Sequence, residues 1–154
     1  MTDRQGTDHD VLNGVAWIGP APRPIGVPVI PLSGPGRGAL LRDAVTIRRA
    51  GVEIALVSAQ SGRLRDVAMG CTLGGVAGVV GFFDHGPAGP DPDGARNLPW
   101  WQRRIHRFAC ADAESAREWG RAGIALGRIV VIPPGAHERE ALAAIVREVR
   151  SMGR

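Results

Sequence analysis

The chain has 154 residues, 44% of them hydrophobic, a size and composition that suit one domain with a sizeable core. No apolar run approaches the roughly 20 residues of a membrane-spanning helix, and the polar N-terminus lacks the apolar segment of a signal peptide, so we expect a cytoplasmic protein without a membrane span. The net charge is +4 and all 19 basic residues are arginines, but no recognition motif or aromatic platform accompanies them, so nucleic-acid binding is not expected.

The N-terminal part of the chain predicts little regular structure. Residues 1–13 are expected to form a flexible tail, ahead of an α/β domain over 14–135 and a C-terminal helix within 136–154. Val15–Ile18 predicts a short strand, and Val27–Leu32 predicts an extended segment whose prolines disfavour an interior strand. The glycine-rich segment 33–38 lacks the ending of a P-loop, so it is interpreted as a plain connection rather than a phosphate cradle.

A helix is expected over residues 39–50. Its apolar spacing would turn four side chains toward a sheet: Leu40, Leu41, Val45 and Ile47. The arginines would point outward or lie near the helix C-terminus, where cations suit the helix dipole: Arg42, Arg48 and Arg49. Arginines can also bind phosphates bidentately, although a solvated surface is the simpler interpretation here.

The rest of the chain alternates strand-like runs with helical patterns. The strand-like runs, rich in Val and Ile, are Val52–Val57, Val76–Phe83 and Arg128–Ile132. Helices are expected over Ser61–Leu73, Trp100–Arg107, Ala113–Ala122 and Glu138–Met152. This alternation predicts a three-layer α/β/α Rossmann-like domain with a mostly parallel sheet of about four to six strands. Because strands covered on both faces are apolar throughout, its core would contain Ile54, Leu56, Val79, Val80, Val130 and Ile132.

Two further inferences follow from this fold class. Parallel sheets of α/β domains bind ligands at the carboxyl ends of their strands, so the loops after Val57, Phe83 and Ile132 are candidate binding segments. Cys71 and Cys110 lie in apolar surroundings without metal-ligand spacing, and they are expected to be buried thiols.

One series of segments is specific enough to suggest a family. A helix ending in Arg, followed by a strand and a polar loop, is expected over Ile47–Gln60, and a helix ending before a Gly-Val turn over Ser61–Val76. A strand ending in His-Gly follows over Val79–Pro87, and then a helix with aromatic and Arg residues over Trp100–Arg107. Then come a strand and acidic helix over 108–119, with Asp112 at a helix-capping position, and Arg-Ile-Val-Val-Ile-Pro-Pro-Gly over 128–135. The series resembles the N-terminal, acceptor-side domain of family-4 GT-B retaining glycosyltransferases. That resemblance implies a Rossmann-like half-enzyme fold and, if the chain is active, hexosyl transfer.

The resemblance also implies a site. In that family the histidine after this strand faces the acceptor cleft and the donor sugar, which makes His85 the candidate catalytic residue, with Asp84 able to orient its imidazole. The candidate substrate-binding residues are Ser58, Gln60, Ser61, Trp100, Trp101 and Gly135. Either tryptophan can stack on a sugar ring or a lipid, although anchoring of the local structure is the alternative for at least one of them. No metal and no cofactor is expected.

Departures from the family limit the expected activity. The first helix and the C-terminal domain that holds the nucleotide sugar are not recognisable in these residues, and Pro134 stands where the family has Asn. We therefore expect an acceptor-binding or non-catalytic domain that uses a nucleotide sugar only with a partner domain. Its partners would be a sugar or lipid acceptor and a donor-binding partner chain or a second copy. The alternatives are a small stand-alone glycosyltransferase using the loop at His85, and a Rossmann-like interaction module without sugar chemistry.

Overall fold

The computed structural model describes residues 11–19, 25–32, 38–58, 64–83, 103–135 and 137–152, without the side chains of 64–66. Its strands are β1 (Val15–Ile18), β2 (Val29–Ile30), β3 (Ile54–Ser58), β4 (Gly78–Phe83), β5 (Arg107–Cys110) and β6 (Ile129–Val131). Its α-helices are α2 (Ala39–Arg49), α3 (Leu64–Leu73), α4 (Ala113–Arg121) and α5 (Glu138–Met152), and a short 3-10 turn, η2 (Leu126–Arg128), precedes β6.

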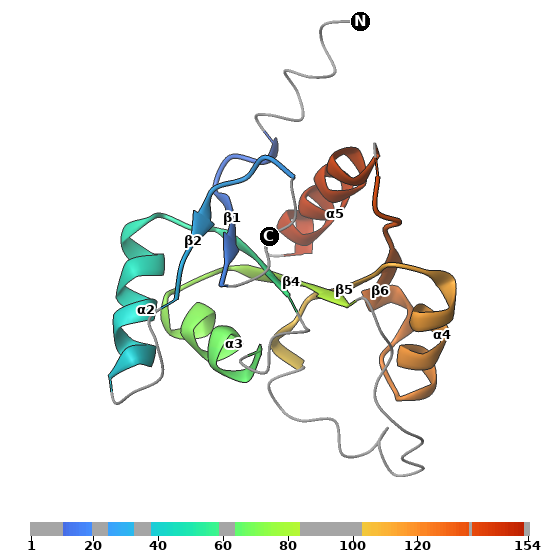
Figure 1. Cartoon of the computed structure of the whole chain (residues 1–154), viewed down its shortest axis with the longest axis horizontal. Helices are drawn as coiled ribbons and strands as arrows, with labels where there is room; N and C mark the ends of the chain where they lie inside the picture. The colour runs from blue at the N-terminus through green and yellow to red at the C-terminus, as the bar shows by residue number, and fades with distance from the viewer. Residues whose placement is uncertain are drawn as a thin grey trace, which may run out of the picture.

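The strands form one six-stranded sheet in the order β2-β1-β3-β4-β5-β6, and every neighbouring pair is parallel. The parallel α/β sheet predicted from the sequence is therefore confirmed. The strands added after β1 lie on both sides of it: β2 on one side, and β3 to β6 in succession on the other (Figure 1). The direction in which successive strands are added to the sheet therefore reverses next to β1. Sheets of this kind bind ligands at the carboxyl edge beside such a reversal.

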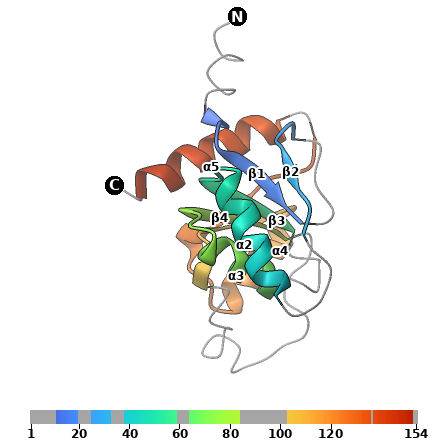
Figure 2. The same cartoon turned by 90° about the vertical axis from the view of Figure 1, so that its left-hand side faces the viewer.

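Helices cover the two faces of the sheet unequally. On one face, Ile47 of α2, Cys71 of α3 and Trp119 of α4 pack with one set of strand side chains. On the other face α5 packs alone among the α-helices of the described residues, and its apolar stripe is buried against the alternate set: Leu142, Ala143, Ile145, Val146 and Val149. Figures 1 and 2 show α5 across the sheet from α2 and α3. The predicted three-layer architecture is confirmed.

The face under α5 is completed by segments outside the regular elements. Leu12 and Ile25 are buried there beside Trp17 of β1, whose ring lies 5.1 Å from that of Phe82. Residues 11–13, which the sequence placed in a flexible tail, are held against this face because Leu12 enters the core and Arg150 of α5 donates hydrogen bonds to the carbonyls of Val11 and Asn13.

The predicted core is buried with one qualification. Ile54, Leu56, Val79, Val80 and Ile132 are buried, whereas Val130 is only half-buried. The reason is position: β6 is the last strand of the sheet, so one of its edges has no neighbouring strand.

Two predictions about helices are wrong. Of the helix expected over 100–107, residues 105–107 are not helical, because Arg107 begins β5 and its neighbour Phe108 pairs with Gly81 of β4. On α2, Leu41 and Val45 were expected to face the sheet, yet they are 65% and 48% exposed. Pairing with a neighbouring strand and packing against α3 decide these positions rather than local apolar spacing.

The buried side of α2 is the one that meets both the sheet and α3. Its buried residues are Ala39, Asp43, Ala44 and Ile47. Gly74, directly after α3, lies so close that a Cβ built there would be 3.1 Å from the Ala44 carbonyl oxygen and 3.0 Å from Ile47 Cγ2. This close approach turns the opposite side of α2, with Leu41 and Val45, toward solvent.

Candidate functional site at the carboxyl edge of the sheet

The candidate site begins where β1 and β3 end side by side. β1 ends at Ile18, Gly19 follows with φ +94°, and β3 ends at Ser58, which is 8% exposed. An L-residue rarely adopts such a positive φ, and a Cβ at Gly19 would also lie 3.1 Å from Leu32 Cδ1. Glycine is therefore required here, and it lets the chain leave β1 in a tight turn at the point where ligands enter sheets of this order.

The next described part of this edge follows β5. Asp112 caps α4, since its carboxylate oxygen Oδ1 accepts a 2.7 Å hydrogen bond from the backbone N–H of Ser115. This confirms the capping position expected from the sequence. Cys110, the last residue of β5, is buried, and burial together with the nearby Asp112 charge raises its thiol pKa to about 11. Such a thiol stays protonated near neutral pH and is a poor nucleophile.

The chain after β6 completes the described edge. Ile132 is buried, while Pro133, Pro134 and Gly135 are exposed. Gly135 has φ +147°, and its carbonyl accepts a hydrogen bond from the backbone N–H of Glu138 at the start of α5. The Pro-Pro-Gly turn thus leads from the end of β6 toward the start of α5.

The structure places two of the predicted substrate-binding residues at this edge, but it does not bring them together. Ser58 ends β3 and Gly135 follows β6, and β4 and β5 lie between them. With neighbouring strands about 4.8 Å apart, three strand steps put β6 roughly 14 Å from β3. A ligand that contacts Ser58 would therefore have to extend across β4 and β5 to reach the segment after β6.

The remaining predicted site residues lie outside the described residues: Gln60, Ser61, Asp84, His85, Trp100 and Trp101. β4 ends at Phe83, one residue before Asp84, so the segment with the candidate catalytic pair leaves the sheet at the carboxyl edge. The placement of the pair itself stays a prediction.

Sequence reasoning missed a polar cluster at the opposite, amino edge. Arg107, 6% exposed, donates to the His106 carbonyl at 2.8 Å and to Glu148 Oε1 of α5 at 2.9 Å. Arg128 donates to the Ile105 carbonyl, and its guanidinium carbon lies 5.3 Å from the centre of the Phe108 ring. The cluster residues adjoin an apolar strand, and nothing in their spacing distinguishes them from surface arginines.

His106 belongs to the same cluster and has a structural task. Its backbone N–H donates to the Val79 carbonyl at 2.8 Å, and its imidazole Nδ1 accepts the Val79 N–H at 3.1 Å. Burial, and then the positive charges of Arg128 and Arg107, lower the pKa of His106, so the imidazole stays neutral and able to accept. The His106 side chain therefore joins β4 to the start of β5.

The described residues contain neither a metal cluster nor a spanning helix. No three of their His, Cys, Asp or Glu side chains come together as metal ligands. None of the helices in these ranges is long and apolar enough to cross a membrane. The Cys71 thiol is buried in α3, and burial raises its pKa to about 12, so it is an inert core residue.

Comparisons with known proteins add no assignment: no protein-family model matches the chain, and neither a curated protein nor a solved structure does.

Proposed function

We propose that this domain binds a sugar or lipid acceptor at the carboxyl edge of its sheet, and that sugar transfer requires a donor-binding domain from a partner chain. The observation that carries the proposal is the strand order, with its reversal beside β1. In sheets of this kind the ligand crevice lies outside the carboxyl ends of the strands flanking the reversal. Ser58 ends one of these strands and Gly19 follows the other.

The order of elements also supports the proposal. From α2 to β6 the described elements follow the succession that resembles the acceptor-side domain of GT-B glycosyltransferases, with a helix between successive strands except between β4 and β5, where most of the connection lies outside the described residues. A fold alone does not fix a function, so the proposal depends on the loops that leave the carboxyl edge.

The need for a partner follows from the chemistry of the resembling family. GT-B transfer takes place in a cleft between two domains, which excludes water from the activated sugar. The described residues form one sheet with its covering helices, and such a domain provides one wall of that cleft. His85 would act on the acceptor side, with Asp84 beside it, once a donor domain closes the other side.

A turnover assay tests this proposal. The purified chain is incubated with UDP-glucose, UDP-N-acetylglucosamine and GDP-mannose and with sugar and lipid acceptors, and nucleotide release is measured. We expect no release by the chain alone. Turnover by the chain alone that His85→Ala abolishes would contradict the proposal and support a small stand-alone enzyme.

A second candidate is a Rossmann-like interaction module without sugar chemistry. The strand order β2-β1-β3-β4-β5 supports it, because this is also the flavodoxin-like order. Proteins with unrelated functions share that order. The two candidates differ in ligand: only the first predicts that sugars perturb the carboxyl edge.

A further inference from the structure

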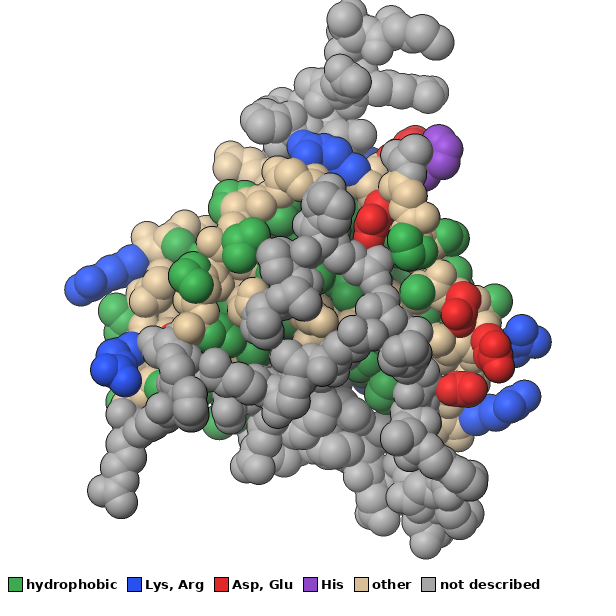
Figure 3. Space-filling view, viewed as in Figure 1, with side chains coloured by type: hydrophobic (Ala, Val, Ile, Leu, Met, Phe, Trp, Pro, Cys, Tyr) green, Lys and Arg blue, Asp and Glu red, His purple; other side chains and the backbone are tan. Residues whose placement is uncertain are grey.

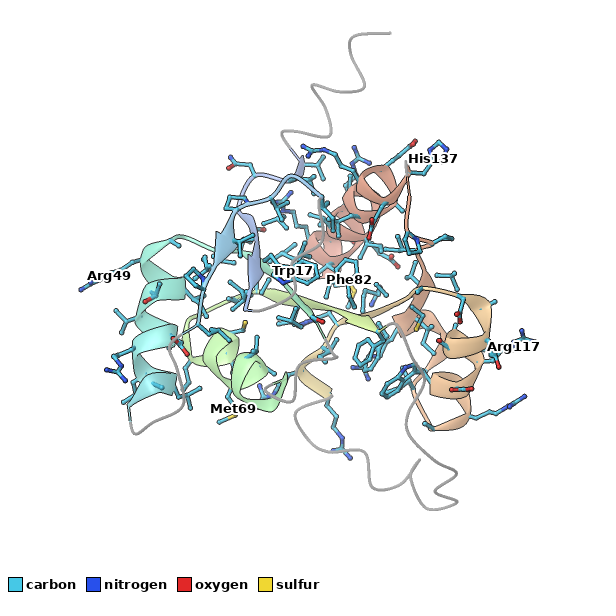
Figure 4. All side chains as sticks on the ribbon, viewed as in Figure 1. Trp17, Arg49, Met69, Phe82, Arg117 and His137 are labelled. Atoms are coloured by element: carbon cyan, nitrogen blue, oxygen red, sulfur yellow. The ribbon has the colours of Figure 1, made fainter. Side chains whose placement is uncertain are left out.

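The outward face of the α2–α3 pair exposes apolar side chains that the fold does not use. Leu41 and Val45 of α2 are 65% and 48% exposed, and Leu73 of α3 is 49% exposed. Met69 of α3 is half-buried and points away from the sheet, as does Arg49 of α2 (Figure 4). These residues, together with Arg42 and Arg48, are called the α2–α3 outer face.

The geometry of the helix pair explains why this face is separate from the core. Gly74, directly after α3, lets α2 approach closely, since a Cβ there would lie 3.0 Å from Ile47 Cγ2. The core-facing residues of α2 are thereby buried on its inner side. Leu41 and Val45 lie one turn apart on the outer side, so they form a stripe of their own.

Positive charge flanks this stripe. At 100° per residue, Arg48 lies on one side of Leu41 and Val45, and Arg42 and Arg49 lie on the other, all of them exposed. The only acidic residue of α2, Asp43, is buried on the inner side. Figure 3 shows arginines beside hydrophobic side chains at the α2 end of the molecule, whereas acidic side chains accompany the arginines at the α4 end.

The helix dipole does not account for all of these charges. Arg48 and Arg49 occupy the last turn, where a cation is stabilised by the dipole. Arg42 is the fourth residue of α2, whose first turn has no acidic residue. The dipole does not stabilise a cation at this end of the helix, whereas an acidic partner beside the exposed apolar residues would.

We propose that the α2–α3 outer face docks an acidic amphipathic helix of another protein. The apolar side of that helix would cover Leu41, Val45 and Leu73, while its carboxylates would pair with the flanking arginines. Charge selects this partner over a second copy, because two copies meeting at this face would oppose arginine to arginine. Nucleic acid would leave the apolar stripe uncovered, and membrane-surface helices carry a larger face with Trp, Phe or Leu.

The surface lies on one face of the sheet rather than at its carboxyl edge, so the proposal does not depend on the proposed function. Only a few aliphatic side chains are covered and exposed ion pairs contribute little, so the complex is weak and salt-sensitive.

Titration of the 15N-labelled full chain followed by amide chemical shifts tests the proposal. The probe is a synthetic helical peptide with Leu at positions i, i+3, i+4 and i+7 and Glu at most others. The controls are the same peptide with Lys in place of Glu, phosphatidylserine vesicles and duplex DNA. We expect the acidic peptide alone to shift amides, mainly those of residues 39–49 and 67–73, with an affinity that falls as salt rises.

Matched variants sharpen the result. Leu41→Ser with Val45→Ser should weaken binding at least about fivefold, and Arg42→Glu with Arg48→Glu at least as much, because all four side chains are exposed and the fold does not need them. Leu126→Ser, at a site 79% exposed beside β6, should leave binding unchanged. Absence of localised shifts, equal binding of the basic peptide, stronger binding of vesicles or DNA, or indifference to the α2 variants would overturn the proposal.

Discussion

The two edges of the sheet use polar residues differently. At the amino edge, long side chains tie elements together: Arg107 joins the start of β5 to Glu148 of α5, and Arg150 joins α5 to Glu53 before β3. At the carboxyl edge the described contacts are local turns and caps, such as the Asp112 carboxylate on the Ser115 N–H and the Gly135 carbonyl on the Glu138 N–H.

The comparison teaches where function can be accommodated. Arginines bonded to backbone carbonyls at the amino edge are committed to the fold, so changing them costs stability. Loops at the carboxyl edge are built on local turns, so they can vary without disturbing the core, as binding loops on a rigid scaffold do.

Gly78→Ala should destabilise the fold most. Gly78 opens β4 at the amino edge, and a Cβ there would clash with Val149 Cγ1 of α5, so the cost is expected to be about 1–3 kcal/mol. Urea unfolding followed by circular dichroism measures it. Gly127→Ala, with nothing within 4 Å of its Cβ, is the matched control and should be nearly neutral. Adding Val149→Ala should recover part of the loss; no recovery would mean that the contact is not the cause.

Arg150→Met should cost about 1–2 kcal/mol, because it removes hydrogen bonds to the carbonyls of Val11 and Asn13 and the 3.1 Å ion pair with Glu53. Hydrogen exchange should accelerate at residues 11–13 in particular. Arg150→Lys keeps the charge but not the planar fork, so it should recover less than half of the loss. Unchanged exchange at residues 11–13 would show that this arginine does not hold the N-terminal segment.

Asp112→Ala at the carboxyl edge should cost about 1 kcal/mol through loss of the α4 cap, measured from the urea midpoint. Asp112→Asn keeps an acceptor oxygen and should be close to the parent protein. The effect should be confined to α4. A loss of several kcal/mol, or one spread over the sheet, would contradict the view that this edge is built on local contacts.

His106 should make stability depend on pH to a small extent. Its pKa in the folded protein lies below the ordinary value of 6.5 because of burial and the Arg128 and Arg107 charges. Below pH 6.5 the unfolded chain therefore binds more protons, so this contribution is complete above that pH and is lost as the pH falls toward the folded pKa. In His106→Asn, an amide oxygen can accept the Val79 N–H without titrating, so the pH dependence of the unfolding free energy should flatten. An identical dependence in both proteins would assign it to other groups.

The sequence was sufficient for the elements whose packing follows their own apolar pattern. α5 extends over the predicted range Glu138–Met152, and β1 has the predicted bounds Val15–Ile18. Parallel topology was also predictable, since Val- and Ile-rich runs separated by helices have few other solutions.

The errors arose where a neighbour decides the conformation. Leu41 and Val45 have helical spacing suited to a core, but the approach of α2 to Gly74 selects the adjacent stripe instead. Arg107 continues a helical pattern, but pairing with Val80 of β4 makes it the first residue of β5. At the candidate site, Ser58 and the Asp112 cap were predictable from strand ends and capping rules, whereas the separation of Ser58 from Gly135 depends on the number of strands between them.

The carboxyl edge is tested most directly by mapping sugar binding on the 15N-labelled chain with glucose, mannose and a simple glycolipid headgroup as probes. The account predicts amide shift changes at or beyond the carboxyl ends of the strands, including Gly19, Ser58 and Gly135, with no change near Arg107 and Glu148 at the amino edge. Shifts confined to the amino edge, or none with any of the three probes at high millimolar concentration, would contradict the claim that this edge is an acceptor site.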